Sequence, residues 1–198
     1  VAGAVSYRPT DHWVFGLSFD TNTFNLPWRA YNAGVAASRY EARTSYLDNE
    51  SRRFDLGYQH LRLSDDNVNQ GVSASWTERW YSGPISQFQT TLGVGASKNR
   101  LTDTAYFSPS SDKSVDLTAR YQWLTWKRDD RLFLQRVYAS AGSYAQAGFS
   151  SSATYGARYE HEWRFRRSLI VTYGIGVAYH PYDGQRERRT LGYLNLAI

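Results

Sequence analysis

The segment Arg158–Phe165 alternates charged and mostly aromatic side chains with a period of two. The even positions carry Arg158, Glu160, Glu162 and Arg164, and the odd positions carry Tyr159, His161, Trp163 and Phe165. Successive side chains of a β-strand point to opposite faces, so this segment predicts a strand with one charged and one aromatic face. A soluble sheet packs the apolar face on a core. A membrane barrel instead turns it to lipid and keeps the polar face in a wet lumen.

The same two-residue period recurs along most of the chain. Other clear examples are residues 12–20, 71–77, 87–97, 115–123 and 171–179. Each segment is about ten residues long, which is the length a tilted strand needs to cross the hydrocarbon of a bilayer. No run of 18 apolar residues occurs, so the sequence predicts no transmembrane helix. The repetition favours a transmembrane antiparallel β-barrel, an all-β fold.

The alternation changes phase near His60. Phe54, Leu56 and Tyr58 set one phase, and Leu61 and Leu63 set the other. An extra residue in one strand shifts the phase in this way, so we predict a β-bulge near His60.

The composition agrees with a barrel in the cell envelope. Aromatic residues make up 16% of the chain, with 16 Tyr and 7 Trp, as interfacial girdles require. There is no Cys, which excludes disulfide and thiolate chemistry. A net charge of +5 would be compatible with nucleic acid, but the basic residues are scattered singly on strands and turns. We therefore expect no nucleic-acid partner.

The connections between the segments indicate the topology. Short links are expected at residues 8–11, 47–50, 82–84, 128–130 and 166–168, and longer ones near residues 21–31, 64–69, 100–113, 146–152 and 180–189. Short and long links alternate, as they do between the periplasmic turns and outer loops of bacterial barrels. Five Trp residues lie near the short links and mark that interface: Trp13, Trp80, Trp123, Trp126 and Trp163.

This spacing yields eleven strands. Single-chain outer-membrane barrels normally have an even number. The first strand, near Ala2–Arg8, runs into a short turn and so begins on the outer side. We therefore expect further strands upstream, and interpret the chain as a fragment of a larger barrel.

Four segments resemble the C-terminal domain of the PgaA family. They are Asp103–Ser110, Trp123–Trp126, Arg158–Trp163 and Tyr179–Gly184. The resemblance implies a sixteen-stranded barrel in the bacterial outer membrane, of which about eleven strands are present here. It also implies an upstream periplasmic domain of tetratricopeptide repeats, absent from residues 1–198, that would contact polymer-processing machinery. The chain lacks the usual terminal aromatic residue, since it ends in Ile198.

The implied function is export of partly deacetylated poly-β-1,6-N-acetyl-D-glucosamine, a biofilm exopolysaccharide, from periplasm to cell surface. Free amines make this polymer cationic, so inward carboxylates would ease its passage. Parity places six carboxylates inward: Asp20, Glu41, Asp55, Asp116, Glu160 and Glu162. It also allows three aromatic side chains to stack on sugar rings from the lumen: Trp126, Tyr138 and Tyr144.

The same parity places arginines inward, which supports an alternative for these carboxylates. The inward arginines are Arg39, Arg43, Arg120, Arg136, Arg158 and Arg164. Cross-strand pairs of opposite charge stabilise sheets. The charged residues could therefore rigidify the wall and set the pore size without touching polymer.

Two other functions remain open, a general diffusion porin and an outer-membrane barrel hydrolase. For a hydrolase the candidates are His161 and the His180–Asp183 couple, but no Gly-x-Ser-x-Gly turn accompanies them. We expect no enzyme activity, and the motifs predict neither a cofactor nor a metal site. The basic run Arg186–Arg189 is either a solvated loop or a contact with lipopolysaccharide, which we expect as a partner together with outer-membrane lipid.

Overall fold

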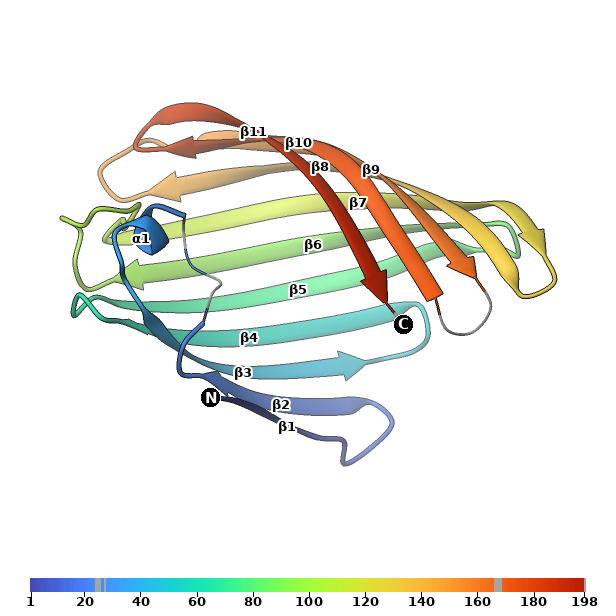
Figure 1. Cartoon of the computed structure of the whole chain (residues 1–198), viewed down its shortest axis with the longest axis horizontal. Helices are drawn as coiled ribbons and strands as arrows, with labels where there is room; N and C mark the ends of the chain where they lie inside the picture. The colour runs from blue at the N-terminus through green and yellow to red at the C-terminus, as the bar shows by residue number, and fades with distance from the viewer. Residues whose placement is uncertain (24–25, 27, 166–168, 198) are drawn as a thin grey trace. The chain divides into compact units, whose positions relative to one another are not determined.

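The computed structural model describes residues 1–23, 26, 28–165 and 169–197, and these contain eleven β-strands and one short helix (Figure 1). The strands are β1 (Ala2–Tyr7), β2 (Trp13–Asp20), β3 (Ala37–Leu47), β4 (Arg52–Leu63), β5 (Val68–Ser82), β6 (Ser86–Asn99), β7 (Ser111–Arg128), β8 (Arg131–Gln146), β9 (Ser152–Phe165), β10 (Leu169–Tyr182) and β11 (Gln185–Ala197). The helix is α1 (Trp28–Asn32). They form one antiparallel sheet in sequence order. The predicted all-β class and the eleven strands are confirmed.

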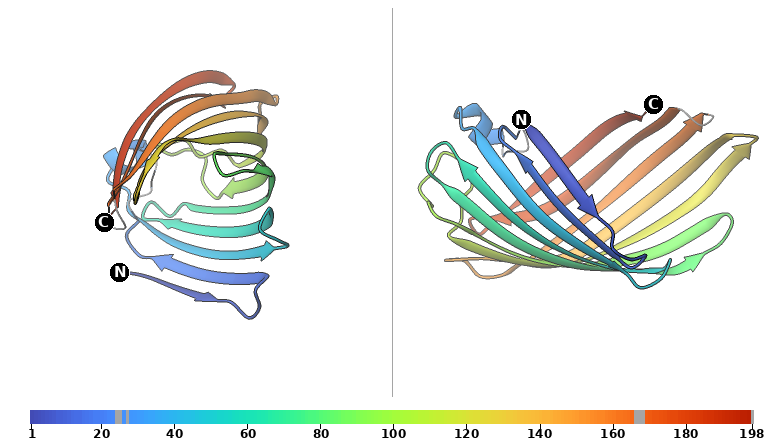
Figure 2. Two further views of the ribbon diagram at one scale, coloured as in Figure 1. Left: turned by 90° about the vertical axis from the view of Figure 1, so that its right-hand side faces the viewer. Right: turned by 90° about the horizontal axis from the view of Figure 1, so that it is seen from below.

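The sheet divides into two compact units. The first contains Val1–Trp76, Gly93–Val115 and Tyr144–Ser151, and the second contains the rest of the chain. Within the first unit β1 to β4 lie side by side, and within the second β9 to β11 do so (Figure 2). No described helix is long and apolar enough to cross a membrane.

In the first unit, the strand register separates a polar from an apolar face. Ser18 on β2 pairs with Glu41 on β3, which pairs with Gln59 on β4, so these three side chains share the polar face. Leu17 and Leu56 point the other way and are 60% and 61% exposed. The pleat of the strands therefore produces the two faces that the alternation predicted.

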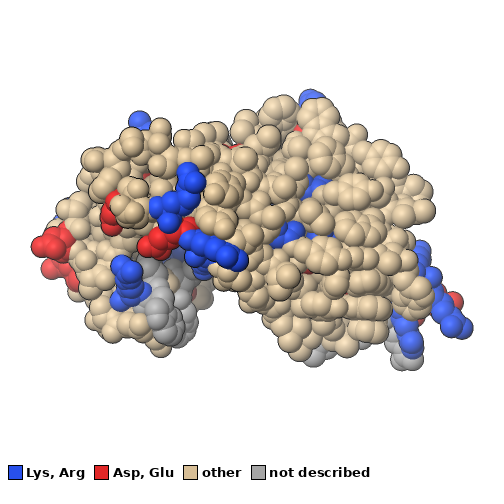
Figure 3. Space-filling model, turned by 90° about the horizontal axis from the view of Figure 1, so that it is seen from above, with Lys and Arg blue, Asp and Glu red and all other residues tan. Residues whose placement is uncertain are grey.

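The second unit repeats this division. Glu160 on β9 pairs with Gly174 on β10, which pairs with Tyr193 on β11. The neighbouring pair of Tyr159 and Ile175 lies on the opposite face, where Ile175 is 69% exposed. Figure 3 shows one side of the molecule that is mostly uncharged, with Lys, Arg, Asp and Glu gathered in a few separate groups. A mostly uncharged surface is compatible with contact with lipid.

Aromatic rings form a row across four strands of the first unit, and three of the four rings lie at strand ends that adjoin short connections. The ring centroids of Trp13 and Tyr46 are 4.9 Å apart, those of Tyr46 and Phe54 are 6.5 Å apart, and those of Phe54 and Trp76 are 6.2 Å apart. The row crosses β2, β3, β4 and β5 in turn. It has the character of an interfacial aromatic girdle.

The prediction of a β-bulge near His60 is wrong for the pairing of β3 with β4. Their register runs without interruption from Ala37 opposite Leu63 to Leu47 opposite Arg53. Leu61 and Leu63 lie on the polar face and are nonetheless buried, at 7% and 8% exposure.

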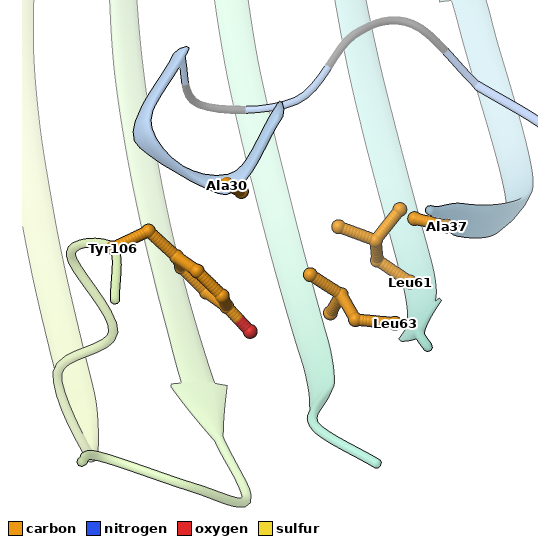
Figure 4. Close-up of a cluster of buried hydrophobic side chains, with 5 residues drawn as sticks. All are labelled: Ala30, Ala37, Leu61, Leu63 and Tyr106. Atoms are coloured by element: carbon orange, nitrogen blue, oxygen red, sulfur yellow. The ribbon is translucent and has the colours of Figure 1, made fainter. Parts of the chain in front are cut away.

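Leucine is tolerated at these two positions of the polar face because other parts of the chain cover them. Ala30 of α1 and Tyr106 of the β6–β7 connection pack with Leu61, Leu63 and Ala37 in one buried cluster (Figure 4). Ala30 is fully buried there. The change of phase therefore marks a covered patch of the polar face.

The predicted strict alternation of short and long connections is also wrong. The β4–β5 link is only residues 64–67, and the β10–β11 link is only Asp183 and Gly184. Asp183 (φ 49°) and Gly184 (φ 74°) both adopt positive φ, which permits a two-residue hairpin turn. β10 and β11 consequently stay paired up to Tyr182 and Gln185. The turn predicted at residues 166–168 lies outside the described residues.

Candidate functional site: the polar face of the sheet

Glu160 and Glu162 on β9 share one guanidinium, that of Arg136 on β8. Arg136 Nη1 lies 2.6 Å from Glu160 Oε1 and 2.7 Å from Glu162 Oε2. The two carboxylates are two residues apart, so the pleat places them on the same face. Each glutamate is only 7% exposed. The predicted polar-face position of both residues agrees with this geometry.

Each carboxylate has a further donor, one on β9 itself and one on β11. The Nε of Arg164 donates to Glu162 Oε1 at 2.6 Å, and the hydroxyl of Tyr193 on β11 donates to Glu160 Oε2. Arg136 in turn donates from Nε to Gln122 Oε1 on β7 at 2.7 Å. Hydrogen bonds to charged groups are among the strong ones in proteins. The result is a charged ladder that links β7, β8, β9 and β11.

Tyr138 connects this ladder to Arg158. The Arg158 Cζ lies 3.8 Å from the centroid of the Tyr138 ring, which is a cation–π arrangement. The Tyr138 hydroxyl donates to Glu160 Oε1 at 3.5 Å. Tyr138 therefore lies on the polar face, as the parity predicted, with its ring already covered on one side.

A second charged cluster lies on the polar face of the first unit. Glu41 forms ion pairs with Arg39 at 3.4 Å and with Arg43 at 3.0 Å, and it accepts a hydrogen bond from the Ser18 hydroxyl at 3.4 Å. Asp20 on β2 lies directly opposite Arg39 on β3 in the strand register. A cavity of about 450 Å³ is lined in part by Asp20, Arg39 and Glu41. Two of the six predicted carboxylates thus meet at one cavity.

The remaining predicted residues are placed as follows. Asp55 lies opposite Ser45 on the polar face and pairs with Arg53 at 2.6 Å. Asp116 is half-buried, and no hydrogen bond or ion pair joins its side chain to another described residue. Tyr144 is buried at 7% exposure.

Trp126 does not join the polar face, contrary to the parity prediction. Its ring centroid lies 6.4 Å from that of Trp163, which stacks on Phe133 at 4.2 Å on the aromatic face. Trp126 is 42% exposed. The alternation of burial is lost from Thr125 to Arg128, where β7 approaches its turn at Asp129. Trp126 therefore belongs with the aromatic rings at this strand end.

Sequence reasoning missed a buried polar network around Asn67, which is fully buried. Its Nδ2 donates to Tyr106 Oη and Ser108 Oγ, both at 3.0 Å, and its Oδ1 accepts from the backbone N–H of Val68 and Leu101. All four hydrogen-bonding positions of the amide are filled. An Asn between two strands reads only as a turn residue, so no signal in the sequence marked it.

Tyr106 adds an acidic contact to this network. Its hydroxyl donates to Asp65 Oδ2 at 2.8 Å. Burial raises the pKa of the Tyr106 phenol above its usual value, and the Asp65 carboxylate adds to the rise. The network therefore holds the β4–β5 and β6–β7 connections together in the neutral state of the phenol.

The histidines are packed as aromatic rings. The ring of His161 meets those of Phe133, Tyr159 and Tyr173 edge-on, with centroid separations of 5.1, 4.7 and 5.0 Å. The ring of His180 lies 4.7 Å from that of Tyr182. Within the described ranges, no group of three or more His, Cys, Asp or Glu is arranged to hold a metal ion.

Comparison with known proteins identifies the family. The model of the PgaA membrane β-barrel domain matches residues 2–198. The chain belongs to this family. PgaA-family membership confirms the resemblance found in the sequence, and it places the chain in the bacterial outer membrane. The apolar face is accordingly the lipid-facing one, and the polar face lines the lumen.

Individual relatives are more distant. The chain is 24% identical over 185 residues to the poly-β-1,6-N-acetyl-D-glucosamine export proteins of Escherichia coli K12 and of Escherichia coli O157:H7. The match covers 91% of this chain but 22% of those proteins. A solved bacterial polysaccharide outer membrane secretin has the same fold, with a TM-score of 0.93 and 21% identity over 98% of this chain and 68% of that one.

Proposed function

We propose that this PgaA-family barrel domain forms part of a pore that exports partly deacetylated poly-β-1,6-N-acetyl-D-glucosamine across the outer membrane. The observation that carries the proposal is the Glu160–Arg136–Glu162 ladder on the polar face, opposite the aromatic face of β9. Family membership and the names of the curated relatives support the same assignment.

The carboxylates would act by lowering the barrier for a cationic chain. A close contact between opposite charges is worth roughly 1 kcal/mol in wet surroundings. Glu160 and Glu162 would share their oxygens between Arg136 and passing amines, whereas Asp116 has no competing partner among the described residues. Asp20, Glu41 and Asp55 would offer further contacts, with Tyr138 and Tyr144 as surfaces for sugar rings.

The wider assembly belongs to the same proposal. We expect residues 1–198 to be the C-terminal part of a longer barrel, whose upstream periplasmic domain meets polymer-processing machinery. The Cζ of Arg186 lies 5.5 Å from the centroid of the Tyr155 ring, and Arg188 lies opposite Tyr179 in the strand register. Both arginines therefore lie beside aromatic residues near the β10–β11 hairpin. We expect these two arginines to contact the phosphates of lipopolysaccharide.

The test removes charge and keeps shape. Full-length protein carrying Asp116→Asn, Glu160→Gln and Glu162→Gln is compared with the wild type for polymer secretion and for passage of a small neutral sugar. We expect secretion to fall severalfold while sugar passage stays normal, since about 1 kcal/mol per contact accumulates along a polymer. A control triple variant changes carboxylates outside the strands: Asp11→Asn, Asp129→Asn and Asp130→Asn. Undiminished secretion would leave the carboxylates as ion-paired wall residues, and equal loss of both solutes would indicate a damaged pore.

A further inference from the structure

A second feature of the polar face in the second unit is a cavity of about 420 Å³. Its base includes Gly156 and Gly176, which lie diagonally across β9 and β10. Tyr138 and Arg158 line it from β8 and β9, and Arg189 and Leu191 line it from β11. None of the described residues that line it is an Asp or a Glu.

The two glycines give the cavity its depth. A Cβ on Gly156 would lie 3.0 Å from the Val177 carbonyl oxygen and 3.2 Å from Ser140 Oγ. A Cβ on Gly176 would lie 3.2 Å from the Ala157 carbonyl oxygen. A larger residue at either position would thus crowd the backbone of the neighbouring strand. Glycine within a strand commonly marks a place where another group approaches the backbone closely.

The cavity offers hydrogen-bond donors that the protein does not use. Arg158 Nε is buried and has no hydrogen-bond partner among the described residues, although the guanidinium is held against Tyr138. Arg189 lines the same space and is exposed, so its guanidinium is accessible to a ligand. Because Arg158 Nε is shielded, the donor open to a ligand is the exposed Arg189 guanidinium, and the half-buried Arg158 adds positive charge to the wall. Two arginines without a lining carboxylate also repel a cation.

We propose that this cavity binds the acetamido group of an N-acetylated hexosamine unit and disfavours a unit with a free amine. This inference rests on the proposed function, because it concerns the same polymer. The acetamido carbonyl accepts from Arg189, and its methyl group packs against Leu191 and the glycine base. The charged ladder adjoins the cavity through Tyr138, whose hydroxyl reaches Glu160. Acetylated and deacetylated units of one chain therefore meet neighbouring sites of opposite chemistry.

The test compares two oligosaccharides on purified full-length protein in detergent. The probes are β-1,6-linked glucosamine oligomers of equal length, one fully N-acetylated and one fully deacetylated, and binding is measured by calorimetry. Arg189→Gln should weaken binding of the acetylated oligomer by roughly tenfold, the effect of losing one hydrogen bond to a charged group. Binding of the deacetylated oligomer should stay the same or tighten. Arg131→Gln removes the same charge from an exposed position at the start of β8 that does not line the cavity, and it should change neither affinity.

A second variant guards against a folding defect. Ala178→Leu keeps both arginines and fills the cavity from β10, so it should weaken the acetylated oligomer alone. The inference would be overturned if both variants lost affinity equally for the two oligomers, or if neither variant lost affinity for the acetylated one. Displacement of the acetylated oligomer by millimolar inorganic phosphate would also overturn it, because this would indicate an anion site. Failure of both oligomers to bind wild-type protein would instead count against the proposed function itself.

Discussion

The side-chain amide of Asn67 donates a 3.0 Å hydrogen bond to the hydroxyl of Tyr106 and so ties the β4–β5 connection to the long β6–β7 connection. The same tyrosine packs beside Ala30 of α1 over Leu61 and Leu63. Three connections are thereby fixed over the polar face of the first unit. Because this face lines the lumen, the contact also limits how far these connections can move aside for a solute.

Asn67→Ala should lower the free energy of unfolding by about 2 kcal/mol, because it leaves the partly buried N–H groups of Val68 and Leu101 without their acceptor. Urea unfolding of the full-length protein in detergent would measure this loss. Asn195→Ala, which changes an exposed asparagine on β11, is the control and should be nearly neutral. Equal stabilities of the two variants would mean that the network adds nothing to the fold.

Tyr106 should make the first unit sensitive to alkaline pH. Burial raises the pKa of Tyr106 in the folded state, so the folded protein binds this proton more tightly than the unfolded chain. The stabilisation is complete below the unfolded pKa, near 10, and is lost as pH rises through the higher folded value.

Unfolding midpoints measured between pH 8 and 12 should therefore fall more steeply for wild type than for Tyr106→Phe at the alkaline end. Tyr7→Phe, at a tyrosine that is 67% exposed, should follow the wild type. Parallel curves for wild type and Tyr106→Phe would show that the Tyr106 proton is not linked to folding.

Arg136 should stabilise the fold because it neutralises both of the glutamates that it binds. Arg136→Gln leaves two poorly exposed carboxylates beside each other, and we expect a loss of up to about 3 kcal/mol. Adding Glu160→Gln and Glu162→Gln to that variant should recover part of the loss, because the uncompensated charges are gone. Arg164→Gln is the control: its side chain is 45% exposed and, among the described residues, it forms an ion pair with Glu162 only, so about 1 kcal/mol or less is expected. Thermal unfolding of the four proteins would separate these effects.

The faces of the strands could be predicted because the pleat decides them locally. Glu160 and Tyr159 point to opposite sides whatever surrounds them, so alternation alone was sufficient. The burial of Leu61 and Leu63 on the polar face could not be predicted from alternation alone. A bulge and a covered patch leave the same mark in the sequence, and the covering residues Ala30 and Tyr106 come from distant connections.

The ends of strands were less predictable for a related reason. Tyr179–Gly184 contains a turn motif, but only the positive φ angles of Asp183 and Gly184 show that the hairpin closes at two residues. Trp126 has the parity of the polar face, yet alternation of burial stops before β7 ends. Its position follows from packing against Trp163, a contact between strands that are not neighbours in the sheet.

The assignment of the two faces can itself be tested on one strand. Leu56 and Gln59 both lie on β4, but Leu56 is on the lipid-facing side with 61% exposure and Gln59 is on the polar face opposite Glu41. Leu56→Lys should cost about 2–4 kcal/mol on folding into lipid vesicles if it lies near the bilayer midplane, whereas Gln59→Lys should cost little, because the lumen is wet. Folding efficiency is measured by the heat-dependent mobility of the barrel on gels. If Gln59→Lys cost more than Leu56→Lys, the lipid-facing and lumen-facing sides would have to be exchanged. Every carboxylate proposed to meet the polymer would then face lipid.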